Sequence, residues 1–530
     1  MLKDTNQMTM DLSPYQGLYE AIIPQDHILR KLKDNIDFSF VNPMLRKQYC
    51  ESFGRPAKEP EMMFKLLFLK KLYDLSDEQL ISRAQTDMAH KYFLGLSPED
   101  KMIDPSLLTK FRKTRITEDI LEDMLKETIQ QAIQKGLVKS GTIIVDATHT
   151  EAAVRAKRVT QVLRDLTRTL RKEIYKHEYD LSEKFPEKPS IEADLSEEIA
   201  YTYELLEQIQ SGVEASDNAE IKALYNRIRE LLDSDRIRQI RSKDDKDARF
   251  GHKTPTSTFF GYKTHIAMSD DRIITGLEVT DGSKPDGEQL PNLLEKSKRN
   301  GVAVKEIVGD MAYVSDSNLA FCEEHHTELY AKTNSAVAAA ANAQLEEGFS
   351  YSKDAHMMQC PAGHLAMRVE KRDAANGNTY YNYYFSAKKC KTCPMRDKCR
   401  VGKSKGRTYS VTCANDAHKA RLEFESSEEF SDKLRIRHRI EEKNGEMKTA
   451  HGLRRADSVG LAAMRLQAYF TAIVVNMKRI VAVIPARRKI LCKRFSTKSR
   501  MALESRADSG LNSLITESHG GQSGMRAGTA

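Results

Sequence analysis

The first hundred or so residues carry the apolar spacing of α-helices. From Gln25 to about Ile116, apolar side chains recur every three or four residues and therefore fall on one face of each helical stretch. Ser76 and Gln79 fit a capping box, which is a signal for the start of a helix. The pattern predicts a compact all-helical module over residues 20–116, called the helical module below.

The helical module has two interpretations. A packing domain would need no particular chemistry, whereas a domain that binds DNA ends needs cations that reach the phosphate backbone. Lys110 and Arg112 lie near the end of the module in a stretch rich in basic residues. We expect these two side chains to contact phosphates if the module binds DNA.

After the helical module the pattern changes to short apolar runs that are typical of β-strands. The β-branched run Gly141–Asp146 begins at a glycine and ends in a carboxylate, and Glu306–Asp310 is a second short strand that ends in aspartate. Phe259–Ile266 and Arg272–Val279 flank a turn sequence and predict a β-hairpin. Helix-like stretches separate the later runs, the last of which is Thr327–Lys332. The alternation predicts an α/β fold with a mixed sheet flanked by helices.

A charged helical segment interrupts the strand pattern over residues 155–245. Apolar positions recur there at a heptad-like spacing, which is more often structural than catalytic. Phe185–Pro189 and Gly212 are expected to break the helical pattern. We therefore predict a helical insertion of two or three antiparallel, coiled-coil-like helices.

Two aspartates stand out because each ends one of the apolar strands. Asp146 and Asp310 follow runs of buried residues, and aspartate is almost never fully buried unless it is paired or bound to a metal. Open α/β sheets bind their ligands at the carboxyl ends of the strands. One such aspartate could simply cap the following helix, but two together favour a metal site.

A third acid is needed, because two-metal phosphoryl transfer uses a small set of shared carboxylates. The strongest candidate is Glu441. Arg437, Glu441 and Lys448 occupy positions i, i+4 and i+11, which lie close to one face of a helix. On that face the acid would bind metal and the two bases would hold phosphate. A solvated helix with ion pairs between positions i and i+4 has the same spacing. Four other acids compete for this role. Glu442 and Glu446 lie on other sides of the helix, and Asp286 and Asp316 lie in loops or at helix starts. Asp286 is a candidate for a supporting role.

These motifs and their order resemble the DDE transposases of bacterial insertion sequences. The resemblance is to the branch whose third acid lies in a signature of tyrosine, arginine, glutamate and lysine with gaps of two, three and six residues, and within it to the family numbered eleven-eighty-two. Arg437, Glu441 and Lys448 match the last three signature positions, while Leu434 takes the place of the tyrosine. The resemblance covers roughly residues 20–484 and includes the strands of both aspartates: Ile144–Thr148 and Val308–Tyr313.

The resemblance implies an RNase H-like core in which Asp146, Asp310 and Glu441 hold two Mg²⁺ or Mn²⁺ ions. It implies cleavage of DNA at the inverted repeats of the element and attack of the freed 3′-hydroxyl on a target phosphate, without a covalent protein intermediate. The expected partners are the element ends, the target DNA and a second copy of the chain, since two ends are joined. We expect a bacterial cytoplasmic protein that associates with the nucleoid and not with a membrane.

Two alternatives use the same fold. A metal-dependent nuclease would cut DNA without joining it, and an inactive remnant of a transposase would only bind DNA. The intact acids argue against the remnant, whereas a transposase and a nuclease need the same metal ligands.

Four of the eight cysteines are grouped in one part of the chain. Cys390 and Cys393 form a Cys-x-x-Cys pair, Cys399 follows, and Cys360 lies upstream across a strand-like stretch. Four thiolates from two turns can close a tetrahedral site, which predicts a structural zinc ion in a small zinc-ribbon-like insertion over residues 346–404, called the Cys-rich insertion. A redox role for Cys390 and Cys393 is the alternative, but no βαβ context surrounds them.

Composition and charge add little to this interpretation. The net charge of +8, from 84 basic and 76 acidic residues, leans toward a polyanionic partner. A basic run at Arg487–Arg500 is either a solvated tail or a contact to nucleic acid. Charged residues interrupt the apolar stretch Leu461–Ile484, which therefore predicts a buried core helix. The N-terminus carries no recognisable export signal, so the thiols are expected to stay reduced.

Together these features divide the chain into six parts. An arm precedes the helical module, the catalytic core is assembled from three segments around the two insertions, and a basic and then disordered tail follows. The predicted bounds are 1–19 for the arm, 20–116 for the helical module, 117–154, 246–345 and 405–484 for the core, 155–245 for the helical insertion, 346–404 for the Cys-rich insertion and 485–530 for the tail.

Overall fold

The computed structural model describes most of the chain between residues 13 and 483. The predicted basic run and tail, and the first twelve residues of the predicted arm, lie outside the described residues. The described residues are 13–50, 56–233, 235–254, 257–333, 349–352, 357–374, 379–393, 395–396, 399, 408–413 and 416–483.

The N-terminal part of the chain is helical, as the apolar spacing predicts. Its helices are α1 (Gly17–Ile22), α2 (Ile28–Asn35), α3 (Val41–Arg46), α4 (Pro60–Leu72), α5 (Asp77–Thr86), α6 (Met88–Leu94), α7 (Ser106–Arg115) and α8 (Glu118–Gln134). The predicted capping box is confirmed, because Ser76 and Gln79 exchange hydrogen bonds at the start of α5. Phe64 of α4 packs against Phe470 near the C-terminus, with ring centroids 5.4 Å apart. The helical module therefore shares one hydrophobic core with the rest of the body.

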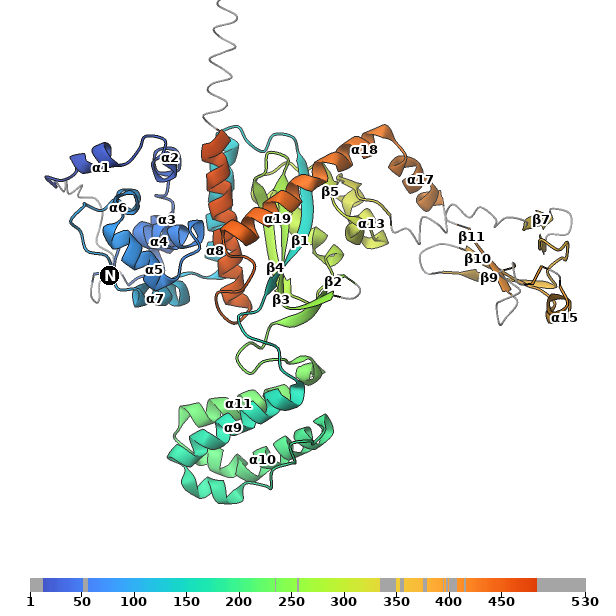
Figure 1. Ribbon diagram of the computed structural model, residues 1–530, viewed down its shortest axis with the longest axis horizontal. Helices are drawn as coiled ribbons and strands as arrows, with labels where there is room; N and C mark the ends of the chain where they lie inside the picture. The colour runs from blue at the N-terminus through green and yellow to red at the C-terminus, as the bar shows by residue number, and fades with distance from the viewer. Residues whose placement is uncertain are drawn as a thin grey trace, which may run out of the picture.

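A six-stranded mixed sheet forms the centre of the protein, between the helical module and the Cys-rich insertion (Figure 1). Its strands are β1 (Thr142–Glu151), β2 (Arg249–Thr254), β3 (Ser257–Ser269), β4 (Ile274–Asp281), β5 (Glu306–Val308) and β6 (Glu328–Tyr330). β3 pairs antiparallel with β1, β2 and β4, whereas β5 runs parallel to both β1 and β6. The strand order is therefore β2, β3, β1, β5 and β6, with β4 also paired to β3, and the predicted β3–β4 hairpin is confirmed.

β1 is longer than the sequence pattern predicts. The predicted strand ends at Asp146, but the chain keeps pairing with β3 as far as Glu151. The added residues are polar, yet Thr148 and Thr150 are buried, and threonine is well suited to a strand. Asp146 therefore lies within β1 and not at its end.

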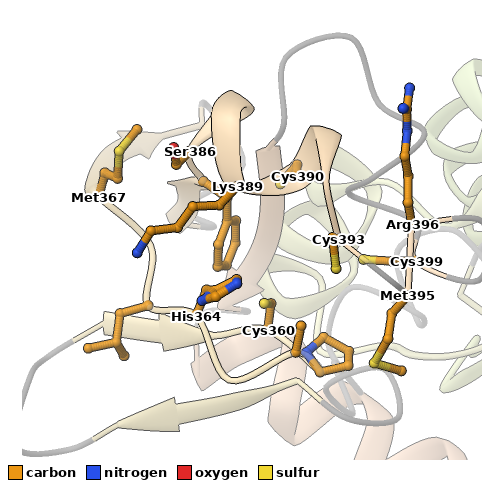
Figure 2. Close-up of a pocket in the computed structure, with 14 residues that line it drawn as sticks. Cys360, His364, Met367, Ser386, Lys389, Cys390, Cys393, Met395, Arg396 and Cys399 are labelled. Carbon is orange, nitrogen blue, oxygen red and sulfur yellow. The ribbon is translucent and has the colours of Figure 1, made fainter.

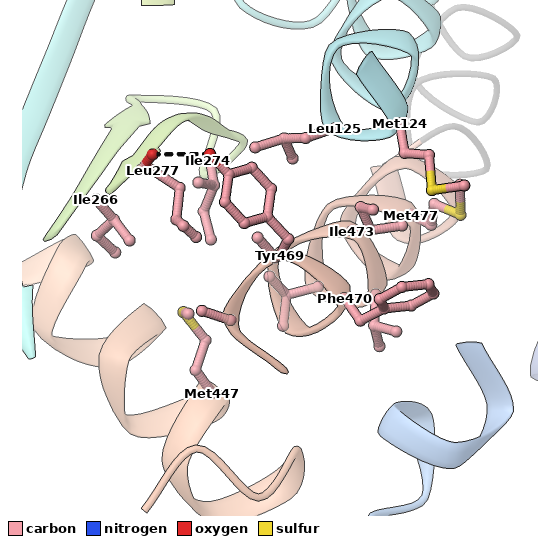
Figure 3. Packing of buried hydrophobic residues seen from close by; sticks show 14 of the residues in the cluster. Met124, Leu125, Ile266, Ile274, Leu277, Met447, Tyr469, Phe470, Ile473 and Met477 are labelled. Atoms are coloured by element: carbon pink, nitrogen blue, oxygen red, sulfur yellow. Dashed lines mark hydrogen bonds between the residues drawn. The ribbon is translucent and has the colours of Figure 1, made fainter. Parts of the chain in front are cut away.

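A long apolar helix, Leu461–Val483, packs against the sheet and is called the C-terminal helix below. Figure 3 shows its side chains among residues of β3, β4, α8 and α19 (His438–Ala450). Asn476 secures it to the strand, since its side chain donates to the Ile274 carbonyl at 2.8 Å and accepts from the Ile274 N–H at 2.7 Å. By length and composition this helix could cross a membrane, but 72% of its most apolar window is buried inside the protein. The predicted core helix is thus confirmed.

The helical insertion forms its own small bundle with a separate hydrophobic core, seen below the sheet in Figure 1. It contains α9 (Val159–His177), α10 (Leu195–Ala215), α11 (Ala219–Leu232) and the short 3₁₀ helices η1 (Tyr179–Lys184) and η2 (Asp235–Gln239). The predicted break at Phe185–Pro189 lies between α9 and α10, but the predicted break at Gly212 is wrong. α10 continues through Gly212, where a Cβ would lie 2.0 Å from Cδ2 of Leu181. This glycine serves close packing inside a helix.

The Cys-rich insertion projects from the body of the protein (Figure 1) and has a small core of its own. It contains β7 (Ser350–Ser352), β8 (Met357–Gln359), β9 (Arg368–Asp373), β10 (Thr379–Tyr384), α15 (Ala387–Lys391) and β11 (Thr408–Cys413). β10 pairs with both β9 and β11, so the insertion extends to residue 413, beyond its predicted end at residue 404. The chain returns to the sheet through α17 (Asp416–Glu425), α18 (Glu428–Leu434) and the short η5 (Arg435–Arg437).

Candidate active site

The pairing of β1 with β5 brings the two predicted aspartates together. The strands run parallel, and their last paired residues are Ile144 and Val308. Two positions farther along each chain lie Asp146 and Asp310, so the register sets them side by side. Asp310 also caps the short helix η4 (Met311–Tyr313), which is the capping role that one aspartate alone would suggest.

Asp146 is partly buried, and two of the charged groups that act on it are carboxylates. Burial, together with the charges of Asp310 and Asp286, raises the pKa of this carboxyl to about 6. The backbone N–H of Ala147 and the cation of Arg437 oppose this shift without cancelling it. A buried acid with a raised pKa beside further acids is a typical setting for a cation-binding or catalytic carboxylate.

Asp286 belongs to the same group of acids, although the sequence indicates only a supporting role for it. Its carboxylate accepts a hydrogen bond from Nζ of Lys263 at 2.8 Å and lies 3.9 Å from Nδ1 of His265. His265 is fully buried, and burial lowers its pKa to about 4, so its ring is neutral at pH 7. Lys263 is thus the cation that directly contacts Asp286.

Asn318 of α13 (Asp316–Glu324) ties the turn of Asp286 to the turn of Asp310. Its Nδ2 donates to the carbonyl of Gly287 and to the carbonyl of Tyr313, both at 2.9 Å. The two turns touch at Gly287, where a Cβ would lie 2.2 Å from the carbonyl oxygen of Ala312. Only glycine allows so close an approach.

The phenol of Tyr313 is buried among these acids. Burial raises its pKa well above the usual range, and the charges of Asp146, Asp286 and Asp310 add to the effect. Its hydroxyl has no hydrogen-bond partner within the described part of the chain. Tyr313 is therefore a neutral donor that can serve a ligand oxygen.

α19 presents a polar face to β1. Nδ2 of Asn444 donates to Oδ2 of Asp146 at 2.9 Å, and Nζ of Lys448 lies 3.4 Å from Nδ1 of His149. Arg437, about two turns before Asn444, is near enough to lower the pKa of Asp146. Arg437, Asn444 and Lys448 therefore share one face, and this face is turned toward Asp146.

Glu441 lies on this face between Arg437 and Asn444, but it does not contact the aspartates. Its side chain is 58% exposed and accepts a hydrogen bond from Nη1 of Arg437 at 3.1 Å. The adjacent Glu442 points elsewhere and pairs with Arg272 at 2.8 Å. In the described part of the chain, no three acidic, histidine or cysteine side chains are gathered closely enough to hold a metal as they stand.

The donor set near Asp146 nevertheless suits a hard divalent cation. Carboxylates and an amide oxygen are the oxygen ligands that Mg²⁺ and Mn²⁺ prefer, and the neutral phenol of Tyr313 can donate a hydrogen bond to an oxygen bound beside them. Oδ1 of Asn444 and the hydroxyl of Tyr313 are buried with no partner among the described residues. Rotation of Glu441 away from Arg437 would add another carboxylate on the same side. The residues therefore fit the predicted metal ions.

The two predicted phosphate contacts of the helical module differ in their surroundings. Arg112 of α7 is held by Asp77, which accepts from Nη1 at 2.9 Å and from Nη2 at 2.6 Å. Asp77 also accepts from Lys70 at 2.6 Å. Lys110, by contrast, is exposed. The guanidinium of Arg112 thus has a structural role that the sequence does not indicate.

The four predicted zinc ligands line a single pocket in the Cys-rich insertion. Figure 2 shows Cys360, Cys390, Cys393 and Cys399 around this pocket, together with His364. The pocket lies far along the chain from the acids of the sheet and belongs to a separate core.

Two contributors to the acidic site were missed in the sequence, namely Asn444 and Asn318. Asn444 could have been found from its position three residues after Glu441, on the same helix face. Asn318 carries no such signal, because its two bonds join turns that are far apart in the chain.

Two parts of the chain match known protein families. Residues 18–114 match a transposase domain (DUF772), and residues 359–481 match a transposase DDE domain. The second match includes α19 with Glu441, the C-terminal helix and the four cysteines. No curated protein matches the chain.

Proposed function

We infer that this chain is a DNA transposase of the DDE class from an insertion sequence. The two transposase matches support the class. The observation that carries the site is the strand register, which sets Asp146 beside Asp310 under the polar face of α19.

We propose that the sheet is an RNase H-like core. The strand pairing supports this, because β4, β3 and β1 are antiparallel neighbours, β1, β5 and β6 are parallel neighbours, and the acids lie on β1 and just after β5. The family numbered eleven-eighty-two remains our assignment, supported by Arg437, Glu441 and Lys448 at their signature spacing.

Asp146, Asp310 and Glu441 would hold two Mg²⁺ or Mn²⁺ ions, with Asp286 as an additional carboxylate. When bound, such ions activate a water molecule and neutralise charge on the scissile phosphate. Glu441 must leave Arg437 to take part, and this frees the guanidinium for a DNA phosphate. The Arg437–Glu441 pair is therefore proposed to be a resting arrangement.

The remaining residues of this face orient the reactants. Asn444 holds one carboxylate oxygen of Asp146, so that the other stays available. Lys448 has a pKa lowered by burial and by the nearby cations of Lys253 and Arg454, which together make a positive track beside the acids. We propose that the DNA backbone follows this track. In-line attack, first by water and then by a 3′-hydroxyl, requires no covalent bond to the protein.

DNA binding by the helical module rests mainly on Lys110, because Arg112 would have to share its guanidinium with Asp77. We propose that two copies of the chain act together in the cytoplasm, since two element ends must be brought to one target. The module would hold the ends while the acids cut them.

A joining assay separates this function from a nuclease that only cuts. The substrate is DNA from the flanks of the gene, incubated with the protein, Mg²⁺ and a circular target plasmid. A transposase yields strands covalently joined to the target, and Asp146→Asn yields none while still binding the ends. Cutting without any joining would favour the nuclease, and no cutting of either flank would contradict both.

A further inference from the structure

We propose that Cys360, Cys390, Cys393 and Cys399 bind one structural zinc ion, without which the Cys-rich insertion does not fold. This site is separate from the acids of the sheet and does not depend on the proposed transposase activity. Three observations carry it: the shared pocket, the backbone turns that hold the thiols and the small size of the local core.

The four thiols reach the pocket from two separate segments. Cys360 follows β8, whereas the other three lie on α15 and in the stretch after it, and Figure 2 shows both groups around the same space. The first segment supplies one thiol and the second supplies three, and ligands that converge from two separate turns are typical of ribbon-like zinc sites.

Backbone hydrogen bonds shape both turns. At the first, the carbonyl of Cys360 accepts from the N–H of Gly363 at 2.8 Å, and its N–H donates to the carbonyl of His364 at 2.9 Å. At the second, the carbonyl of Cys393 accepts from Arg396 at 3.1 Å, and the N–H of Cys399 donates to Met395 at 2.9 Å. Tight turns of this kind fix the backbone position of each cysteine, so that only the side-chain rotamer remains to be set.

The local core is too small to hold the insertion by itself. It contains few fully buried apolar residues in the described part of the insertion and is not continuous with the main core. Segments of this size need a metal, disulfides or a partner to stay folded. Three of the cysteines, Cys360, Cys390 and Cys399, already border this core. A zinc ion at the pocket would link β8 and α15 to Cys393 and Cys399.

The thiols are not closely gathered in this structure, in keeping with the absence of any compact metal cluster among the described residues. Zinc binding must therefore draw the four side chains inward by changes of rotamer. Such coupling is expected, because zinc ligands lose protons as they bind and a preformed site is uncommon without the ion. His364 lines the same pocket, so five side chains are candidates for the four ligand positions of a tetrahedral zinc site. We assign the site to the four thiols.

The test is the zinc content of the full-length protein, purified without chelator. We expect about one zinc per chain, a loss of that zinc in both Cys393→Ser and Cys399→Ser, and no loss in His364→Ala. Cys50→Ser is the matched control, because Cys50 is exposed and remote from the pocket. Asp146→Asn must also keep its zinc, which separates this ion from any metal at the acids. Zinc loss in His364→Ala with retention in one cysteine variant would overturn the four-thiolate assignment.

Limited trypsin digestion tests the folding claim on the same samples. Lys388, Lys389 and Lys391 lie on α15, beside the pocket. Removal of zinc should make cleavage at these lysines at least several-fold faster, and added zinc should reverse the change. Less than about half a zinc per chain, or equal cleavage with and without chelator, would contradict the proposal.

Discussion

The Nδ2 of Asn444 donates a hydrogen bond to Oδ2 of Asp146 at 2.9 Å and so joins α19 to the central strand β1. The two residues are almost 300 positions apart in the chain. This bond fixes the rotation of α19, and with it the side on which Glu441 emerges. The polar face of α19 is thereby placed over Asp146.

Replacement of Asn444 should weaken the site without unfolding the protein. Asn444→Ala frees Oδ2 of Asp146 and removes a restraint on α19, and losses of this kind commonly lower metal affinity or activity by on the order of 10–100-fold. Thr449→Ala, at an exposed position on the same helix, should leave Mg²⁺-dependent nicking unchanged. Equal nicking by both variants would remove Asn444 from the site.

Asp286 is expected to contribute to metal binding. Asp286→Asn removes one of the charges that surround Asp146 and should weaken Mn²⁺ binding, measured by titration calorimetry, by on the order of 10-fold or more. Asp316→Asn is the matched control, since Asp316 is an exposed acid of α13. If both variants bind Mn²⁺ as the unaltered protein does, Asp286 only pairs with Lys263.

The stability of the metal-free protein should depend on the titration of Asp146. Its folded-state pKa of about 6 lies above its ordinary value of 3.8, so the folded state holds more protons between these values. Stability from this group is therefore present below about pH 4 and is lost as the pH rises through 6, with a slope of at most about 1.4 kcal/mol per pH unit. Asp146→Asn should lack this component. Parallel stability curves for the two proteins between pH 4 and 7 would contradict the assignment.

Lys110 and Arg112 should give opposite results when replaced. Lys110→Ala should weaken binding to element-end DNA. The slope of log affinity against log salt concentration should fall by about 1, and the melting temperature should not change. Arg112→Ala breaks the two bonds to Asp77 and should destabilise the protein by about 1–3 kcal/mol. Urea unfolding and DNA titration at several salt concentrations measure both effects. The reverse outcome would return Arg112 to the DNA interface.

Much of the fold follows from local pattern. The apolar spacing of the helical module, the β3–β4 hairpin and the core helix all concern neighbouring residues, and the structure agrees with them. The errors occur where tertiary contacts override local signals. Gly212 stays within α10 because Leu181 packs against it, and β1 continues past Asp146 because β3 offers it a partner.

The site divides in the same way. Asp146 and Asp310 can be predicted because each follows a short apolar run in the sequence, and the strand register then sets them together. Asp286 and Asn318 join the site through contacts between turns that are distant in sequence, for which no pattern exists. Arg112 is the opposite case. Its charge predicts a DNA contact, but in the structure its guanidinium is paired with Asp77.

We propose that Glu441, and not its neighbour Glu442, is the third metal ligand. Glu441 and Glu442 are adjacent, similarly exposed residues of α19, and each is paired with an arginine. The decisive measurement is Mg²⁺-dependent nicking of element-end DNA by Glu441→Gln and Glu442→Gln, with DNA binding measured in parallel. We predict a loss on the order of 100-fold or more for Glu441→Gln, with binding retained, and near-normal nicking for Glu442→Gln. Normal nicking by Glu441→Gln would rule out Glu441 as a metal ligand.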